Sequence, residues 1–260
     1  MNPIDVQNVS FAYKGNNTVL EDISFTVQQG SVTGLLGVNG AGKSTLTWLL
    51  CNMLEPNQGN INILGEKLTM DSDHIKAQFG VLPADDPLIE HLTVEEYLTF
   101  VGRLYNIDKK LLPGRINQLL PLFALEEFRK KQNRHLSTGT RRKVGILSTL
   151  LHSPKLLVWD EPFNGLDPIA SATLKELIAT LKANGITILF TSQVLEPVEA
   201  VCDAVLILDN KRLMLNQTMT EIKEQILAAN VQTLEQLLVK LASKMPETAG
   251  SMRDMSWLKV

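Results

Sequence analysis

The sequence predicts an α/β fold, with a mostly parallel β-sheet covered by helices on both faces. Short apolar segments alternate along the chain with longer segments of helical periodicity, which is the pattern of parallel strands connected by helices. The composition also suits a folded domain, because 44% of the 260 residues are hydrophobic and 20% are charged. Such a chain can bury a large core, so a disordered or fibrous protein is excluded.

The N-terminal part predicts several strands and one helix. Its first two segments alternate apolar and polar residues, are rich in β-branched or aromatic side chains, and are separated by the turn-like residues 14–17. Further on, the glycine-rich residues 37–42 separate an apolar strand from a helix. The expected strands cover residues 6–13, 20–27, 31–36, 61–64 and 80–82, and the expected helix covers residues 43–54.

The middle of the chain, from about residue 84 to residue 151, is expected to be a helical subdomain inserted into the α/β domain. Thr93 and Glu96 fit a capping box, in which Thr93 caps the helix and Glu96 reaches back to it. Apolar residues follow at mostly helical intervals. Two further helices are expected over residues 113–123 and 139–151.

Strands and helices alternate again after residue 151, and a helical tail follows. We expect one domain over residues 1–215 and a C-terminal tail over residues 216–260. In the tail, residues 220–244 carry apolar side chains at helical intervals without a sustained heptad, which favours packing on the main domain over a free coiled coil. The expected strands cover residues 155–159, 186–190 and 204–208, and the expected helices cover residues 168–183 and 198–202.

Charge and composition limit the classes of function. The 25 Lys and Arg residues against 28 Asp and Glu residues give a net charge of −3, which does not suit a general nucleic-acid binder. The basic run Arg141–Lys143 is interpreted as a solvated helix face. Cys51 and Cys202 lack metal-type spacing. No apolar run approaches the ~20 residues of a bilayer span, and no secretory pattern is seen, so we expect a cytoplasmic chain.

A phosphate-binding loop is predicted between the apolar strand over residues 31–36 and the helix that follows. The segment matches the pattern G-x-x-x-x-G-K-[ST], in which backbone N–H groups surround phosphate oxygens, the lysine reaches the terminal phosphates and the serine hydroxyl binds Mg²⁺. The alternative, a glycine-rich turn without a ligand, does not explain so many matched positions. The chain is therefore expected to bind a nucleoside triphosphate through Gly37, Val38, Asn39, Gly40, Ala41, Gly42, Lys43, Ser44 and Thr45.

Two carboxylates are predicted to complete the metal and water end of this site. Asp160 and Glu161 follow the apolar strand over residues 155–159. Asp160 is placed to hold Mg²⁺ through water, and Glu161 to polarise the attacking water as a general base. Acidic residues at strand ends are usually solvated loop residues, and it is the complete phosphate loop that favours the functional interpretation here.

With these motifs in place, residues 4–215 resemble the nucleotide-binding subunit of an ATP-binding cassette (ABC) transporter. The resemblance implies a P-loop NTPase cassette with a mostly parallel RecA-like sheet, an N-terminal antiparallel β subdomain and an inserted helical subdomain. Tyr13 stands where the family places an aromatic ring on adenine, although a core aromatic on an edge strand is the alternative. Asp167 falls in a segment that resembles the D-loop at the dimer interface. The family's signature, which clamps the γ-phosphate held by the opposite subunit, corresponds to Leu136, Ser137, Thr138, Gly139 and Thr140.

The amino-acid sequences of the motifs most resemble those of single-domain exporter ATPases of the drug, bacteriocin and sodium efflux branch. This resemblance implies ATP and Mg²⁺ as ligands and a second ABC ATPase subunit as partner, in a homodimer or a heterodimer. It also implies two transmembrane permease subunits or domains, through which the chain would be attached to the inner face of the cell membrane. A soluble cassette protein for DNA repair or the ribosome is disfavoured by the absence of a long insertion or basic extension.

Three departures from the family pattern leave the level of activity open. Ala84 falls where the family has the Q-loop glutamine, with Asp85 and Asp86 beside it. Thr138 replaces the first signature glycine, and Thr140 replaces the signature glutamine. Gln193 replaces the switch histidine, and its amide can donate a hydrogen bond to the γ-phosphate but cannot shuttle a proton. We therefore carry two hypotheses, an active ATPase with Glu161 and Gln193 at its catalytic centre and a catalytically weak regulatory subunit paired with an active homologue.

Overall fold

The structure, a computed structural model, describes residues 2–15, 17–69, 71–85 and 88–237. The chain divides into two units, Met1–Thr218 and Met219–Val260. The strands are β1 (Ile4–Tyr13), β2 (Asn17–Val27), β3 (Val32–Leu36), β4 (Gln58–Ile63), β5 (Glu66–Lys67), β6 (Phe79–Leu82), β7 (Leu156–Trp159), β8 (Thr187–Ser192), β9 (Ala204–Asp209) and β10 (Arg212–Thr218). The α-helices are α1 (Lys43–Leu50), α2 (Asp73–Lys76), α3 (Val94–Leu104), α4 (Leu112–Leu119), α5 (Thr138–Ser148), α6 (Pro168–Ala183), α7 (Leu195–Val201) and α8 (Met219–Ala228).

The larger sheet of the first unit confirms the expected mostly parallel architecture. Its strand order is β10-β9-β3-β8-β7-β6, and all pairs except β10–β9 are parallel. Every residue of β3 is buried, which agrees with the continuous apolar character of a central parallel strand. The sequence did not predict β10, because it is an edge strand in which only Leu215 is buried and apolar alternation is weak.

The smaller sheet of the first unit is antiparallel, with the order β2-β1-β4-β5. Ile4 on its central strand pairs with Val27 of β2 on one side and with Ile63 of β4 on the other. This sheet confirms the expected N-terminal antiparallel β region. Its apolar face joins the main hydrophobic core.

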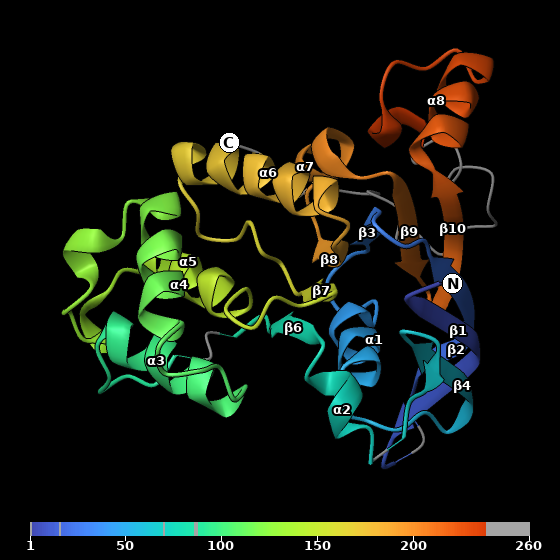
Figure 1. Ribbon diagram of the computed structural model, residues 1–260. Coiled ribbons are helices and arrows are strands. Elements are labelled where there is room, and N and C mark those ends of the chain that lie inside the picture. Colours follow the sequence, from blue (N-terminus) through green and yellow to red (C-terminus); the bar gives the residue numbers. More distant parts are fainter. Residues whose placement is uncertain (1, 16, 70, 86–87, 238–260) are drawn as a thin grey trace, which may run out of the picture. The chain divides into compact units, whose positions relative to one another are not determined.

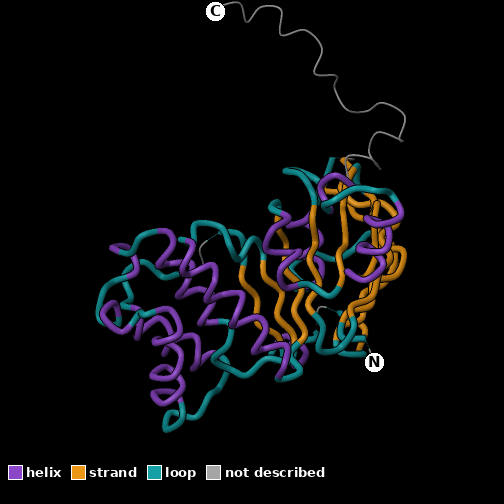
Figure 2. Tube along the Cα trace, turned by 90° about the horizontal axis from the view of Figure 1, so that it is seen from above, coloured by secondary structure: helices purple, strands orange, loops and turns teal. Residues whose placement is uncertain are grey.

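Helices cover both faces of the parallel sheet. Helix α1 lies between the two sheets, where Leu46, Leu49 and Leu50 pack with buried residues of both (Figure 1). On the other face, α6 contacts β8 and α7 contacts β3. The view from above shows the strands of the parallel sheet running side by side (Figure 2). The carboxyl ends of the parallel strands therefore meet at one edge, where the loops that follow them converge.

The segment between β6 and β7 is mainly helical, as expected. Thr93 and Glu96 form the predicted capping box at the start of α3, with each side chain bonded to the other residue's backbone N–H. The helix predicted over residues 113–123 differs, because α4 ends at Leu119 and a 3₁₀ turn covers Leu120–Phe123. Pro121 lies in this turn, and a proline cannot donate the next helical hydrogen bond.

The second unit begins with α8, which lies in the part of the tail that carries apolar residues at helical intervals. Helix α8 ends at Ala228, and Asn230 adopts a left-handed conformation with φ of 52°, which interrupts the helix. A further helical turn covers residues 234–237. Residues 238–244 of that part of the tail lie outside the described residues.

Candidate nucleotide-binding site

The predicted phosphate loop connects the end of β3 to the start of α1. Gly40 and Gly42 have φ angles of 78° and 105°, which L side chains rarely adopt, so glycine is required to curl the loop. At Gly37 the limit is space, because a Cβ atom there would lie 2.6 Å from the carbonyl oxygen of Leu208. The loop thus ends at the N-terminus of an eight-residue helix whose first N–H groups have no partners within the helix.

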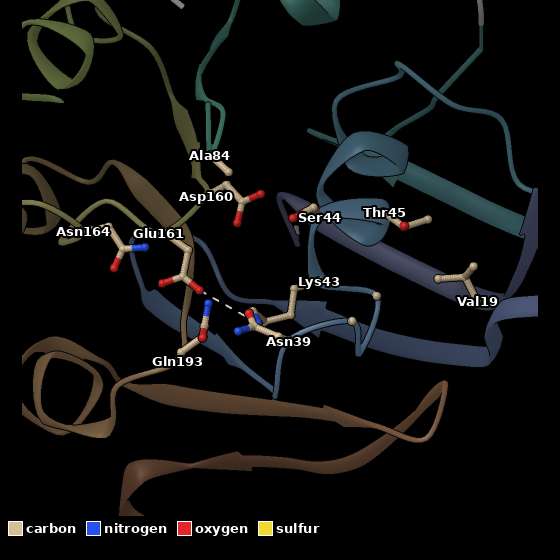
Figure 3. A pocket seen from close by; sticks show the side chains of 12 residues that line it. Val19, Asn39, Lys43, Ser44, Thr45, Ala84, Asp160, Glu161, Asn164 and Gln193 are labelled. Carbon is tan, nitrogen blue, oxygen red and sulfur yellow. Dashed lines mark ion pairs between the residues drawn. The ribbon is translucent and has the colours of Figure 1, made fainter. Parts of the chain in front are cut away.

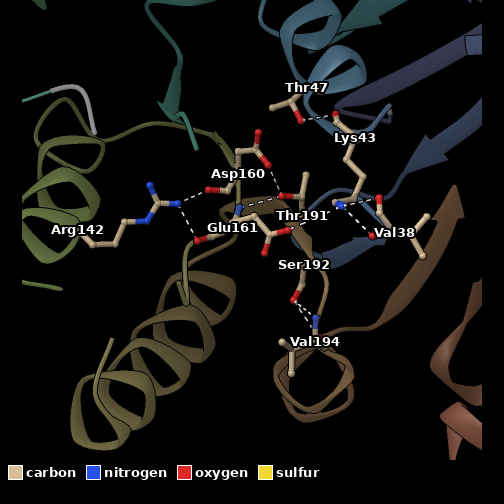
Figure 4. A network of polar contacts seen from close by, with 10 residues as sticks. Val38, Lys43, Thr47, Arg142, Asp160, Glu161, Thr191, Ser192 and Val194 are labelled. Atoms are coloured by element: carbon tan, nitrogen blue, oxygen red, sulfur yellow. Dashed lines mark hydrogen bonds and ion pairs between the residues drawn. The ribbon is translucent and has the colours of Figure 1, made fainter. Parts of the chain in front are cut away.

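Lys43 is the buried cation of this loop, with 7% of its surface exposed. Its Nζ atom donates to the carbonyl oxygen of Gly37 at 2.7 Å and to that of Val38 at 3.3 Å. The same atom lies 3.8 Å from Oε1 of Glu161 (Figures 3 and 4). The ammonium group is thus held over the mouth of the loop by oxygen atoms of the chain itself.

A cavity of about 360 Å³ lies at this edge of the sheet. It receives residues from the segments that follow β3, β6, β7 and β8, as expected for a ligand site at the carboxyl ends of parallel strands. Figure 3 shows these side chains around the cavity. Its lining residues are Val19, Asn39, Gly40, Gly42, Lys43, Ser44, Thr45, Ala84, Asp160, Glu161, Asn164 and Gln193.

Asp160 is buried, with 1% exposure, and its two carboxylate oxygens differ in their contacts. Oδ1 accepts a hydrogen bond from the hydroxyl of Thr191, whereas Oδ2 accepts none from the described residues. A buried carboxylate oxygen without a donor suits a cation or its bound water. Ser44 lines the same cavity, so the two oxygen donors predicted for Mg²⁺ are brought together. A site with few protein ligands agrees with the habit of Mg²⁺ to keep waters and bind substrate phosphates.

Glu161 follows directly and has an unusual backbone. Its φ angle is 51°, in the left-handed region that non-glycine residues seldom adopt. Its N–H donates to the hydroxyl of Thr191 at 2.8 Å, and its carbonyl oxygen accepts from Arg142 at 2.7 Å. Apart from the ion pair with Lys43, its Oε1 atom is buried without a hydrogen bond from the described residues. The carboxylate is therefore held in the cavity with capacity to accept a further proton donor.

Tyr13 lies at the end of β1, beside the cavity rather than in its wall. The residue is 41% exposed, its ring meets that of Phe11 edge to face at 4.9 Å between ring centroids, and its hydroxyl lies 3.2 Å from that of Thr45. Val19, which the sequence analysis did not single out, does line the cavity. Tyr13 is therefore partly exposed next to Thr45, which lines the cavity.

The residues predicted as the signature lie at the start of α5, and none of them lines this cavity. Ser137 caps the helix by accepting from the Thr140 N–H at 3.2 Å, and the two hydroxyls are 2.8 Å apart. A Cβ atom at Gly139 would lie 2.5 Å from the carbonyl oxygen of Gly165, so this turn packs directly on the segment that contains Asp167. Leu136, at the same turn, is buried, and Thr138 begins the helix.

Asp167 holds the start of α6. It accepts from the Ala170 N–H at 2.8 Å and pairs with Lys143 at 3.1 Å. The hydrogen bond from Ala170, with the contact to Lys143, lowers the pKa of the Asp167 carboxyl below its ordinary value. The helix that begins at the predicted signature is thus joined to the predicted D-loop segment by the ion pair between Lys143 and Asp167 and by the close approach of Gly139 to Gly165.

Besides Val19, the polar residues Thr191 and Arg142 were not predicted from the sequence to belong to the site. Thr191 lies near the end of β8, and a polar residue at the carboxyl end of a parallel strand was a usable signal. The interpretation of Arg141–Lys143 as a solvated face is wrong for Arg142, which is 5% exposed. It donates to backbone carbonyl groups, and such partners cannot be recognised from residue types in a sequence.

Comparison with known proteins places this site in a family. A family model described as ABC transporter matches residues 20–164, which is more than half of the chain. The chain belongs to the ABC transporter family. The ABC-type transporter ATP-binding protein EcsA of Bacillus subtilis (strain 168) is 33% identical over 225 residues, covering 86% of this chain and 91% of EcsA.

Two further similarities agree with this membership of the ABC transporter family. The Nod factor export ATP-binding protein I of Ralstonia nicotianae (strain ATCC BAA-1114 / GMI1000) is 36% identical over 198 residues, covering 76% of this chain and 62% of its own length. A solved structure described as the ATP-binding subunit of an ABC transporter superposes with a TM-score of 0.85 at 35% identity, covering 92% of this chain and 99% of the other.

The chain is therefore an ABC transporter ATP-binding subunit, a class of ATPase that works with partner transmembrane subunits. Within the part of the chain that the structure describes, no helix is both long enough and apolar enough to span a bilayer.

Proposed function

We propose that this chain binds and hydrolyses ATP with Mg²⁺ and drives an exporter by nucleotide-dependent dimerisation with a second ABC ATPase subunit. The observation that carries the proposal is the convergence of Lys43, Ser44, Asp160 and Glu161 on one cavity beside a glycine loop. In this proposal the chain lies in the cytoplasm, attached to the inner face of the membrane through two transmembrane permease subunits. Residues 1–215 form its ATPase domain, residues 84–151 the helical subdomain and residues 216–260 a tail.

Each part of the site has its own role in binding or hydrolysing ATP. The N–H groups of the loop and the Lys43 ammonium bind the terminal phosphates, and the exposed Tyr13 ring stacks on adenine. Ser44 and Asp160 hold Mg²⁺, which neutralises charge on the phosphates when it is bound. Glu161 accepts a proton from the attacking water as it approaches the γ-phosphate.

Export, rather than import, is supported by the sequences of the motifs and by the name of one similar protein. The segments around the phosphate loop and Glu161 resemble exporter ATPases, and one similar protein is described as a Nod factor export protein. The cargo is chosen by the membrane subunits in this design. Signature residues Leu136, Ser137, Thr138, Gly139 and Thr140, with Asp167, would meet the nucleotide held by the opposite subunit.

A second candidate function is a catalytically weak regulatory subunit paired with an active homologue. Ala84 and Gln193 line the cavity at the positions where the family resemblance expects a glutamine and a histidine. An alanine offers no side-chain hydrogen bond, and a glutamine cannot carry a positive charge. These two residues favour slow turnover, whereas Lys43, Asp160 and Glu161 favour an active enzyme.

The test is ATP binding and turnover in the purified full-length chain, its Lys43→Ala variant and the control Lys155→Ala. Loss of Lys43 removes a charge-assisted contact worth about 1.5–3 kcal/mol, so ATP affinity should fall by about 10- to 100-fold by calorimetry. Lys155 bonds Gln78 and lies outside the cavity, so its variant should bind ATP normally. Unchanged affinity in Lys43→Ala would contradict the assignment of the loop. Mg²⁺-dependent phosphate release near background, rising only with an added homologue, would favour the regulatory subunit.

A further inference from the structure

Arg142 connects three segments around the candidate catalytic carboxylates. Its guanidinium donates to the carbonyl oxygens of Pro83 at 2.7 Å and Ala84 at 3.3 Å through Nη1. Through Nη2 it donates to the carbonyl oxygens of Asp160 and, at 2.7 Å, Glu161 (Figure 4). One buried side chain at the start of α5 therefore bonds four backbone carbonyls of two other segments.

These carbonyl groups belong to the ends of two neighbouring strands. Pro83 and Ala84 follow β6, Asp160 and Glu161 follow β7, and the two strands pair in parallel up to their last residues. A planar guanidinium with five donors can serve such a set of acceptors at once, whereas a lysine ammonium or an amide group cannot. The start of α5 is thus joined to the edge of the sheet at the cavity.

The backbone of Glu161 is the part of the site that most needs such support. Its left-handed conformation is unfavourable for a side chain with a Cβ atom, so neighbouring contacts must hold it. The Thr191 hydroxyl accepts from its N–H, and Arg142 donates to its carbonyl oxygen, so both peptide groups that flank its Cα are fixed. The direction of the Glu161 carboxylate follows from this backbone.

We propose that Arg142 is a positioning residue for ATP hydrolysis, which holds Glu161 in its left-handed conformation and ties it to α5 and to the segment after β6. This inference rests on the proposed function, in which Glu161 is the general base. A movement of α5 relative to the sheet would displace the carbonyl groups of Glu161 and Ala84 together, because Arg142 bonds both. The hydrogen bonds from Lys43 to the carbonyl oxygens of Gly37 and Val38 do not involve Arg142.

The experiment compares the full-length chain with R142M, R142K and a matched control, R115M. Arg115 also donates from the helical segment to a backbone carbonyl, but its acceptor is Leu151 and not a residue that follows β6 or β7. Misplacement of a catalytic group by ~1 Å can cost about 100-fold, so R142M should lower kcat by about 10- to 100-fold while KM for ATP changes less than about threefold. R142K should keep an intermediate kcat, and R115M should match the wild type.

Amide hydrogen exchange over residues 156–166 provides a second readout that does not require turnover. Exchange should be faster in R142M, intermediate in R142K and unchanged in R115M, because an exchanging amide reports local opening. Wild-type kcat and wild-type exchange in a folded R142M would overturn the proposal. If R142M lacks a cooperative thermal transition, the same two results in R142K overturn it. If the wild type releases no phosphate with Mg²⁺ and ATP, the proposed function fails, and exchange alone decides whether Arg142 holds Glu161.

Discussion

At the scale of single residues, Gln193 is the largest chemical departure of this site from the family pattern. It follows β8 and lines the cavity together with Glu161 and Asn164 (Figure 3). Its amide can donate to a developing negative charge, but it has no proton to give up at neutral pH. The position therefore allows stabilisation of charge without proton transfer.

We expect Gln193→Ala to lower phosphate release by about 10²–10³-fold if the amide donates to the γ-phosphate in the transition state. Gln193→His should raise the rate, because an imidazole can both donate and carry charge. Gln29→Ala, an exposed glutamine outside the cavity, is the matched control. Steady-state phosphate release is the measurement, and equal rates in all four proteins would show that Gln193 takes no part in hydrolysis.

Gly139 offers a second prediction at this scale. A methyl group there would meet the carbonyl oxygen of Gly165 at 2.5 Å, so Gly139→Ala should force the predicted signature turn away from its neighbour and lower the free energy of unfolding by about 1–3 kcal/mol. Gly114, in α4, has open space around it, so Gly114→Ala should instead stabilise by about 0.4–1 kcal/mol. Urea unfolding of both variants tests this, and equal effects would argue against the contact with Gly165.

At the scale of elements, His152 connects the end of the α5 segment to its neighbours. Its ring stacks on Tyr105 at 3.7 Å between ring centroids, and its Nε2–H donates to the carbonyl oxygen of Phe79 at 3.2 Å. Burial lowers the pKa of His152 below its usual value of 6.5, and the hydrogen bond to Phe79 opposes that shift only in part. The folded state therefore favours the neutral ring.

The unfolded chain binds this proton more readily, so His152 should make stability fall as the pH drops below about 6.5 toward the lower pKa of the folded state. His152→Gln removes the titration, and its free energy of unfolding should change less than that of the wild type between about pH 7.5 and about pH 5.5. Urea unfolding at both pH values measures the difference. The same pH dependence in wild type and variant would contradict this role of His152.

The elements that could be predicted from the sequence are those with strong local signals. Helix α6 agrees with its prediction at both ends, because Asp167 and Pro168 mark its start and Asn184 its end. Strand β10 was missed because its pairing is decided by a neighbouring strand rather than by its own alternation. The interruption after α8 was not predicted, because the left-handed Asn230 is not marked by any apolar pattern.

The residues of the candidate site likewise fall into those that the sequence predicts and those that depend on the tertiary fold. The phosphate loop and the two carboxylates are contiguous motifs, and the structure brings them to one cavity. Thr191 and Arg142 act through contacts to residues at least 18 positions away, and five of the six contacts described above are to backbone atoms. Backbone partners of this kind depend on the tertiary fold, so residue types alone do not identify them.

At the scale of the whole molecule, the position of the signature segment leads to a prediction about assembly. Leu136–Thr140 do not line the cavity of their own chain, so under the proposed function they need the nucleotide of a second chain. Glu161→Gln should keep the phosphate contacts, lose the general base and accumulate as an ATP-bound dimer. Light scattering of this variant with Mg²⁺ and ATP should show the dimer mass, and addition of Lys43→Ala should abolish it. A monomer under both conditions would contradict closure of a homodimer.

The ion pair between Lys43 and Glu161 has a consequence for how tightly nucleotide is held. The ammonium already has oxygen partners, namely the carbonyls of Gly37 and Val38 and the carboxylate 3.8 Å away. A phosphate that binds Lys43 must replace some of these oxygen atoms. The measured affinity for nucleotide is therefore the difference between the contacts of Lys43 with phosphate and its contacts within the chain. The Glu161 carboxylate thus competes with phosphate for the Lys43 ammonium. Glu161, the proposed general base, would then also lower the affinity of the site for ATP. The same competition for Lys43 would favour release of the nucleotide after hydrolysis.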